Sequence, residues 1–188
     1  MNDLNCESCK ISRRKLHVRG NTIVKMKGGW ILNHFSGEDA YLGRLVLQPK
    51  CHRMDFDDLS VEEAASLGEN VKQIIRELKN YWRKKFPNDC IKRVYVIYFF
   101  ETPFAKPPPS KSWHMHIHLL PRTEQMIKGN SPTEVAAWKI LELLDWESFP
   151  SEYRIVNKQC KKIKINENSV NELMEYLKES LYKYCKEL

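Results

Sequence analysis

Residues 113–122 have the sequence Trp113-His114-Met115-His116-Ile117-His118-Leu119-Leu120-Pro121-Arg122, in which three histidines alternate with apolar residues. Successive side chains of a β-strand point to opposite faces of a sheet, so a strand here puts all three histidines on one face. With six histidines in 188 residues, chance produces this spacing in fewer than about one such chain in a hundred. Imidazole titrates near neutral pH, so the row predicts a nucleophile with proton-handling neighbours or a metal site.

Composition bounds the class of protein. A chain of 188 residues with 42% hydrophobic residues can bury one sizeable core, and no break in composition demands two. The chain has no apolar run of membrane-spanning length and no secretion signal at Met1–Cys6, so we expect a cytoplasmic protein. Six cysteines without a regular disulfide spacing are expected to be free thiols or metal ligands. The net charge of +7 favours nucleotides, polyphosphates or nucleic acid without choosing among them.

The pattern of strands and helices predicts an α+β fold with a mainly antiparallel sheet. Runs rich in Val, Ile, Tyr and Trp predict strands at 22–26, 29–33, 43–48, 92–100 and 113–120. Capping boxes that begin at Ser60, Ser131 and Ser169 predict helices over 61–85, 132–144 and 170–186. The long helix between the third and fourth strands carries apolar residues at helical spacing and should pack against the core.

We predict a catalytic domain at residues 1–125 and a helical C-terminal extension at 126–188, packed on or near that domain. The proline-rich segment 101–111 leads into the histidines, either as a stiff connector or as a substrate-facing loop. The lysine runs at 161–164 and 183–186 fit a solvated helix face better than a dedicated nucleic-acid patch.

A second cluster of chemistry-bearing residues is the pair Cys6 and Cys9 near the start of the chain. A CxxC pair can supply two of the four ligands that zinc needs, but the residues alone are also compatible with redox thiols or with no role. His52 directly follows a predicted strand, where it could reach the same place as the two cysteines.

The segment His114–Leu120 resembles the His-φ-His-φ-His-φ-φ signature of the histidine-triad (HIT) superfamily of nucleotide hydrolases and transferases. The Cys6–Cys9 pair, the segment Gly43–His52 and the helix beginning at 58–63 are similar to further elements of that family, in the same order. The resemblance covers roughly Cys6 to Arg122. It implies a five-stranded antiparallel sheet with a long helix, usually paired into a homodimer.

The resemblance also implies a chemistry for the middle and last histidines. His116 would form a covalent nucleotidyl-histidine, with a backbone carbonyl at the third histidine holding its other ring nitrogen as N–H. His118 would bond the phosphate or leaving group and act in part as a general acid. Ser112 and backbone amides could steady the developing charge on the phosphoryl oxygens, and Lys111 could add a cation.

Two departures from the family pattern affect substrate binding. The family often carries Gly-Gln-Ser or Gly-Gln-Thr before the histidines, whereas this chain has Pro109-Ser110-Lys111, so its phosphate contacts must differ. The acidic residue that often binds ribose is absent, and Asn33 or His34 stands in that region. Ser110 and Asn33 are therefore the additional candidates for substrate binding.

In zinc-bearing members of the superfamily the metal is held by the CxxC pair, a distal histidine and the first histidine of the signature. Carried over residue by residue, this set is Cys6, Cys9, His52 and His114. A closed Cys2His2 set leaves no position for water, so Zn²⁺ would be structural and would hold the N-terminus against the histidine segment.

The sequence thus predicts a zinc-stabilised nucleotide hydrolase or nucleotidyltransferase that acts on dinucleoside polyphosphates or nucleotide conjugates. One alternative is an aprataxin-like enzyme that removes adenylate from nucleic-acid ends, to which the net positive charge gives weak support. Another is a non-catalytic nucleotide sensor that keeps the pocket without efficient turnover. The base preference, the leaving group and the acceptor are left open by the sequence.

Overall fold

The computed structural model describes residues 6–37, 40–98, 114–123 and 166–186. Five strands within these residues form one sheet in the order β1-β2-β3-β5-β4, and all neighbouring strands are antiparallel. The strands are β1 (Arg19–Lys25), β2 (Trp30–His34), β3 (Leu45–Pro49), β4 (Ile91–Tyr98) and β5 (Ile117–Thr123). The helical elements are α1 (Glu7–Ser12), η1 (Lys27–Gly29), η2 (Phe56–Asp58), α2 (Val61–Lys85) and α5 (Glu167–Lys186). The predicted α+β fold with an antiparallel sheet is confirmed.

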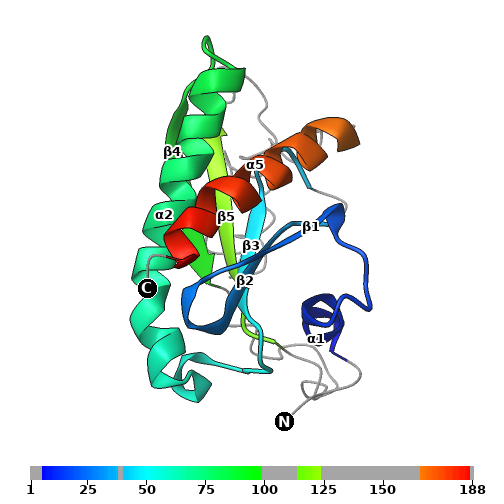
Figure 1. Cartoon of the computed structure of the whole chain (residues 1–188), viewed down its shortest axis with the longest axis vertical. Helices are drawn as coiled ribbons and strands as arrows, with labels where there is room; N and C mark the ends of the chain where they lie inside the picture. Colours follow the sequence, from blue (N-terminus) through cyan, green and yellow to red (C-terminus); the bar gives the residue numbers. More distant parts are fainter. Residues whose placement is uncertain (1–5, 38–39, 99–113, 124–165, 187–188) are drawn as a thin grey trace, which may run out of the picture.

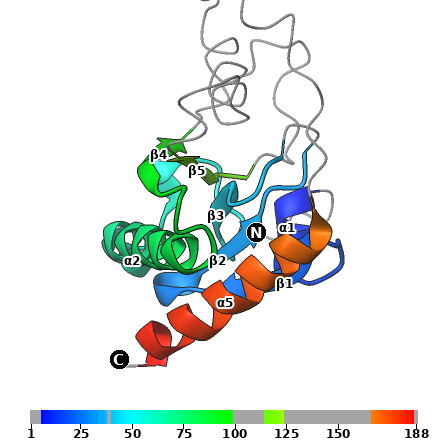
Figure 2. The same ribbon diagram turned by 90° about the horizontal axis from the view of Figure 1, so that it is seen from above.

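The helices α2 and α5 pack on the same face of the sheet, where α5 crosses β1 and lies beside α2 (Figures 1 and 2). The core between these layers contains Leu32, Leu47 and Ile117 from the sheet, with Leu78 from α2 and Leu177 from α5. Because side chains alternate along a strand, Asn33, Val46 and His118, which are paired in register across β2, β3 and β5, point to the other face. The helices therefore cover the apolar face, and His118 lies on the opposite face of the sheet.

The long helix begins as the sequence predicts. Ser60 accepts a hydrogen bond from the Glu63 backbone N–H at 3.2 Å, and the Glu63 carboxylate accepts one from the Ser60 N–H at 2.7 Å. This reciprocal capping box satisfies two of the N–H groups that a helix start leaves unpaired. The helix ends at Lys85, two residues before Pro87, as expected because a residue that precedes proline disfavours helical geometry.

The C-terminal helix begins earlier than predicted, at Glu167 instead of Val170. The side chain of Asn166 accepts the Asn168 N–H at 3.0 Å, and its carbonyl accepts the Val170 N–H at 3.2 Å. Asn is as good a cap as Ser, and its position three residues upstream adds a turn to the helix. The prediction that Ser169 caps this helix is therefore wrong, because Ser169 lies within the helix.

The histidine strand is shifted from its predicted position at 113–120, because β5 begins at Ile117 and ends at Thr123. Residues 114 and 115 are instead bonded to the end of β3 and to the segment that follows it. The Met115 N–H donates to the Arg53 carbonyl at 2.8 Å, and the His114 Nε2–H donates to the Pro49 carbonyl at 2.9 Å. These bonds draw the segment away from the regular ladder, so only His118 of the three histidines lies within the strand.

Several predicted features lie outside the described residues: the helix at 132–144, the proline-rich segment 101–111 and the lysine run at 161–164. The boundary between a catalytic domain and an extension at residue 125 stays a prediction. The helix α5 itself contributes Val170, Leu173, Met174, Leu177 and Leu181 to the same core as the sheet. In the described part of the chain, no helix is long and apolar enough to cross a membrane.

Candidate functional site

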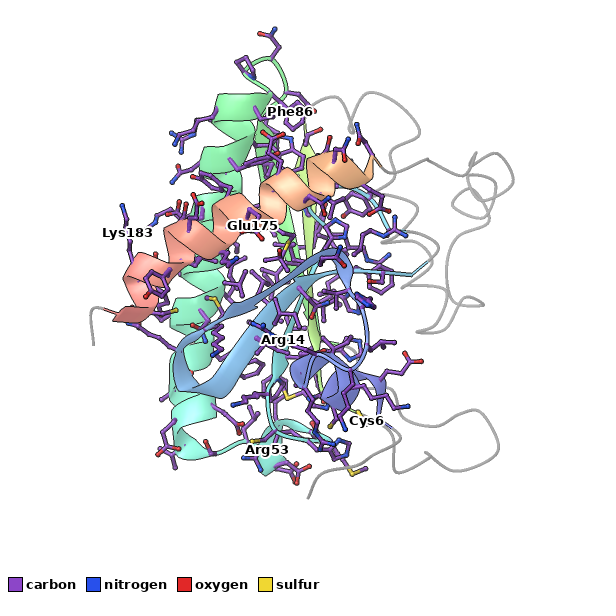
Figure 3. All side chains as sticks on the ribbon, turned by 45° about the vertical axis from the view of Figure 1, so that its right-hand side comes forward. Cys6, Arg14, Arg53, Phe86, Glu175 and Lys183 are labelled. Carbon is purple, nitrogen blue, oxygen red and sulfur yellow. The ribbon has the colours of Figure 1, made fainter. Side chains whose placement is uncertain are left out.

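Two cysteines and two histidines meet where α1, the segment after β3 and the segment before β5 come together. They are Cys6, Cys9, His52 and His114, and their ligand atoms all lie within 4.8 Å of one another. The Nδ1 atom of His114 lies 3.5 Å from the Sγ atoms of both Cys6 and Cys9, and the Nδ1 atom of His52 lies 3.4 Å from Cys9 Sγ. Figure 3 shows Cys6 at the start of α1, on the same end of the molecule as Arg53.

The spacing of these atoms fits a single tetrahedral zinc ion. A sulfur at about 2.3 Å and a nitrogen at about 2.1 Å from one tetrahedral ion lie about 3.6 Å apart. The three sulfur–nitrogen distances of 3.4 to 3.5 Å match this separation. Burial lowers the pKa of His114 to about 4, against a smaller opposing effect of the Pro49 carbonyl, so the imidazole is neutral at pH 7, as a metal ligand must be.

Bonds to the backbone orient two of the cluster side chains, those of His114 and Cys6. His114 donates Nε2–H to the Pro49 carbonyl, which leaves the lone pair on Nδ1 directed at the thiols. The Cys9 backbone N–H points to Cys6 Sγ at 3.5 Å, which fixes the position of this sulfur. The cluster therefore has the right donors with a fixed tautomer, which supports metal binding over a redox pair.

The middle histidine has its own backbone partner. The Nδ1 atom of His116 lies 2.9 Å from the carbonyl oxygen of His114, so Nδ1 carries the proton and donates it. The carbonyl thus belongs to the first histidine, and the prediction that it comes from the third is wrong. The reason is that residues 114–116 precede β5, so the ring of His116 turns back over the preceding residue and not along the strand. Nε2 of the half-buried His116 keeps its lone pair.

The third histidine lies beside the second in a cationic setting. The ring centroids of His116 and His118 are 4.9 Å apart, and His118 is almost fully buried. Burial, followed by the charges of His116 and Arg44, lowers the pKa of His118 to about 3. The imidazole of His118 is therefore neutral at pH 7, so it can donate a hydrogen bond but does not carry the extra proton of an imidazolium.

Phe35 and Arg44 belong to the same surroundings, although the sequence did not single them out. The Phe35 ring meets the His118 ring edge to face at 5.4 Å, and the Arg44 guanidinium lies 3.7 Å from the centre of the Phe35 ring. Arg44 is 3% exposed and follows Gly43, whose φ of +86° only glycine adopts readily. The sequence could have drawn attention to Arg44 through the Gly-Arg pair that begins the Gly43–His52 segment. It contains no pattern that indicates a contact between Arg44 and Phe35.

The remaining candidate substrate residues have different outcomes. Asn33 is buried on the His118 face of the sheet, where its Nδ2 donates to the His34 carbonyl at 3.0 Å. Its Oδ1 is buried and has no hydrogen-bond partner among the described residues. His34 is fully buried, with Nδ1 against the Phe35 carbonyl at 2.8 Å and Nε2 without a hydrogen-bond partner among the described residues. Ser110, Lys111 and Ser112 lie outside the described residues.

The ion pair between Arg53 and Glu63 connects the histidine segment to α2. Arg53 Nε donates to the Glu63 carboxylate at 2.8 Å, and the carbonyl of Arg53 holds the Met115 N–H between the first two histidines. The Glu63 side chain is only 5% exposed and also caps the helix. The Glu63 carboxylate thus connects the start of α2 to Arg53, whose carbonyl positions the histidine segment.

Replacing Arg53 with methionine should cost about 1–3 kcal/mol of unfolding free energy, because the Glu63 carboxylate stays buried without its cation. Denaturant unfolding followed by circular dichroism measures this change. Arg76→Met is the matched control, since Arg76 makes the same kind of pair with Glu77 but its side chain is 57% exposed, and it should cost less than about 0.5 kcal/mol. Equal losses in the two variants would contradict the role given to Arg53.

Stability should fall with acidification below pH 6.5. Burial lowers the folded-state pKa of His34 to about 4 and that of His118 to about 3, so the unfolded chain binds more protons than the folded one below pH 6.5. Each group contributes a slope of up to about 1.4 kcal/mol per pH unit, present in full between roughly pH 6 and 4.5. Unfolding free energies measured across this window should show the slope, and His34→Asn should remove about half of what the two groups supply. An unfolding free energy that does not change between pH 6.5 and 5 would contradict this prediction.

We compared the chain with known proteins. No family model and no curated protein sequence matches it. Among solved structures, a Hit-like protein involved in cell-cycle regulation from Bartonella henselae matches with a TM-score of 0.54 and 15% identity, over 96% of this chain and 100% of that one. A hypothetical histidine triad nucleotide-binding protein from Sulfolobus tokodaii strain7 matches with a TM-score of 0.52 and 16% identity, over 95% and 93% of the two chains. Together with the sheet order and the histidine segment, these matches show that this chain has the histidine-triad fold.

Proposed function

We propose that this protein is a nucleotide hydrolase or nucleotidyltransferase that acts on dinucleoside polyphosphates or nucleotide conjugates through His116. The observation that carries the proposal is the 2.9 Å contact between His116 Nδ1 and the His114 carbonyl. With Nδ1 directed at this carbonyl, Nε2 is the ring nitrogen left to act as the nucleophile. The histidine-triad fold supports the same class of chemistry.

The reaction has two steps. Nε2 of His116 attacks the α-phosphorus, so that a P–N bond forms while the P–O bond to the leaving group breaks, and the departing oxygen takes up a proton. Water or another acceptor then attacks the phosphorus and gives up a proton, the P–N bond breaks, and His116 returns to its neutral form. The overall result is transfer of one nucleotidyl group to the acceptor.

Three neighbours would bind the substrate. Arg44 supplies a positive charge beside His118 that attracts the phosphate, and neutral His118 donates a hydrogen bond to a phosphoryl or leaving-group oxygen. A bound phosphate would raise the pKa of His118, which is the condition for a general-acid role. The unsatisfied Oδ1 of Asn33 can accept from a ribose hydroxyl. Ser110, Lys111 and Ser112 remain the candidates for further phosphate contacts.

The cluster of Cys6, Cys9, His52 and His114 would hold Zn²⁺ as a structural ion. When bound, zinc would supply a rigid four-coordinate link without an open position, so it would activate no water. The same backbone of residue 114 that carries a ligand imidazole also provides the carbonyl that orients His116. A fixed His114 would therefore fix the nucleophile. The need for thiolates is consistent with a reducing compartment such as the cytoplasm.

Chromatographic analysis of products tests the proposal. The purified protein is incubated with dinucleoside polyphosphates, nucleotide phosphoramidates and nucleotide sugars, with and without inorganic phosphate. Release of a nucleoside monophosphate indicates a hydrolase, and a product that appears only with phosphate indicates a phosphorylase or transferase. Measurable nucleotide binding without any product would reject the enzyme and favour the sensor.

We also propose that two copies pair through β4. Among the described residues this strand is an edge of the sheet, the position from which a strand can extend a sheet into a second copy, and Val96 on it is 44% exposed. Light scattering after gel filtration should give twice the 22.3 kDa chain mass, and Val96→Lys should shift the population towards the monomer. A wild type that stays at 22.3 kDa at micromolar concentration would exclude this dimer.

A further inference from the structure

A long groove runs between α2 and α5, on the helical side of the molecule and away from the His118 face of the sheet. Its cavity volume is about 670 Å³. Five of the side chains that line it are cationic, namely Lys27, Arg76, Arg83, Lys84 and Lys183. Among the described residues, two carboxylates, Glu69 and Glu77, line the groove with them. The groove is therefore strongly positive, and it is separate from the proposed active site.

The two carboxylates engage only two of the cations. Lys27 Nζ lies 3.5 Å from Glu69, and Arg76 Nε lies 2.9 Å from Glu77. Arg83, Lys84 and Lys183 have no carboxylate partner within the described residues. Because like charges repel unless an anion lies between them, three such cations in one groove favour an anionic ligand.

The cations are spread along the groove and not gathered at one point. Residues 69 to 84 of α2 line it, which at 1.5 Å per residue is a length of roughly 22 Å. Lys27 also lies against Tyr184, near the end of α5, whereas Arg83 and Lys84 come from the last turn of α2. A single phosphate cannot reach both ends, so a ligand that engages all of these cations would carry several anionic groups in a row.

A second observation distinguishes among such ligands. Gln73 lines the groove and is 9% exposed, and its Oε1 is buried without a hydrogen-bond partner in the described part of the chain. A carbonyl oxygen can only accept a hydrogen bond, so it is not satisfied by phosphate, sulfate or carboxylate. Base amino groups and ribose hydroxyls are donors that occur next to a phosphodiester chain.

We propose that the groove between α2 and α5 binds the backbone of single-stranded nucleic acid. The cations contact successive phosphates over about four nucleotides, and Gln73 accepts a hydrogen bond from a base or a ribose. Binding of this kind is independent of base sequence and depends steeply on salt. It does not require His116.

Fluorescence anisotropy with a labelled eight-nucleotide oligouridine and oligothymidine tests this proposal. For three to five phosphate contacts, the slope of log K against log salt concentration should be about −2 to −3.5. The double variant Arg83→Glu/Lys183→Glu should weaken binding at least about tenfold at low salt. The control Arg14→Glu/Lys15→Glu changes the net charge equally on two exposed residues at a different part of the surface, as Arg14 and Lys183 show in Figure 3, and should stay within about twofold.

An equal loss of affinity in both double variants would contradict the assignment of binding to this groove, because binding would then follow net charge alone. Competition by polyglutamate as effective as by the unlabelled oligonucleotide would overturn the nucleic-acid assignment and indicate an acidic protein partner. Gln73→Leu is the second variant, since it keeps the buried volume and removes the acceptor. It should weaken binding severalfold without changing the salt slope, and a variant that binds as tightly as wild type would contradict the role of Gln73.

Discussion

The His116→Ala variant should release nucleotide from its substrate at least about a thousandfold more slowly than wild type. Loss of a nucleophile removes the covalent route entirely, and the remaining acceleration comes only from binding and from Arg44 and His118. The residual rate is measured by chromatography of released nucleotide under saturating substrate. Because alanine removes a half-buried ring from the end of the sheet, the fold of the variant is checked by thermal unfolding.

The covalent intermediate gives an independent measurement on the same residue. Wild type quenched during turnover should gain the mass of one nucleotidyl group, and peptide mapping should find it on residue 116. The P–N bond is labile to acid, so the quench is alkaline or uses denaturant at neutral pH. His17→Ala, which changes an exposed histidine, is the control and should keep both the rate and the mass gain. Turnover by His116→Ala at a rate near that of wild type would reject the mechanism.

The Cys6→Ser variant should lose bound zinc and become much less stable. Elemental analysis of wild type should find about one zinc per chain, and the variant should hold well below half of that. A structural zinc contributes several kcal/mol to folding, so a loss of at least about 3 kcal/mol is expected, which lowers the Tm by roughly 6–12 °C in a chain of this size. The variant loses stability because zinc would no longer connect α1 to His52 and His114.

Cys51 provides a matched control for the metal site. It is adjacent to the ligand His52 but is exposed and is not part of the cluster, so Cys51→Ser should keep full zinc content and an unchanged Tm. Wild type that is purified without zinc and keeps its Tm in the presence of a chelator would reject the structural metal. Loss of activity together with zinc in Cys6→Ser would further support the link from His114 to His116.

The local rules of the sequence were sufficient for the regular elements. The capping box at Ser60 and the apolar spacing over 61–85 predicted α2 to the residue, because both signals act within one or two turns of the same helix. Four strands were also located within a few residues. The start of α5 was missed because Asn166 competes for the cap with Ser169, and sequence pattern does not rank two good caps three residues apart.

The candidate metal ligands and the candidate nucleophile were identified from the sequence and its family resemblance, whereas their arrangement was not. The bonds from His114 and Met115 to the segment after β3 join residues more than sixty positions apart, and they decide that β5 begins only at Ile117. In the folded chain the His114 carbonyl orients the ring of His116, and Arg44 is buried beside Phe35 and His118. By itself the sequence predicted which residues are candidates for chemistry and determined which local elements form, because both depend on neighbours along the chain. Only the tertiary structure decided which backbone groups hold the histidines and where cations gather, because these depend on contacts whose sequence separation no local pattern encodes.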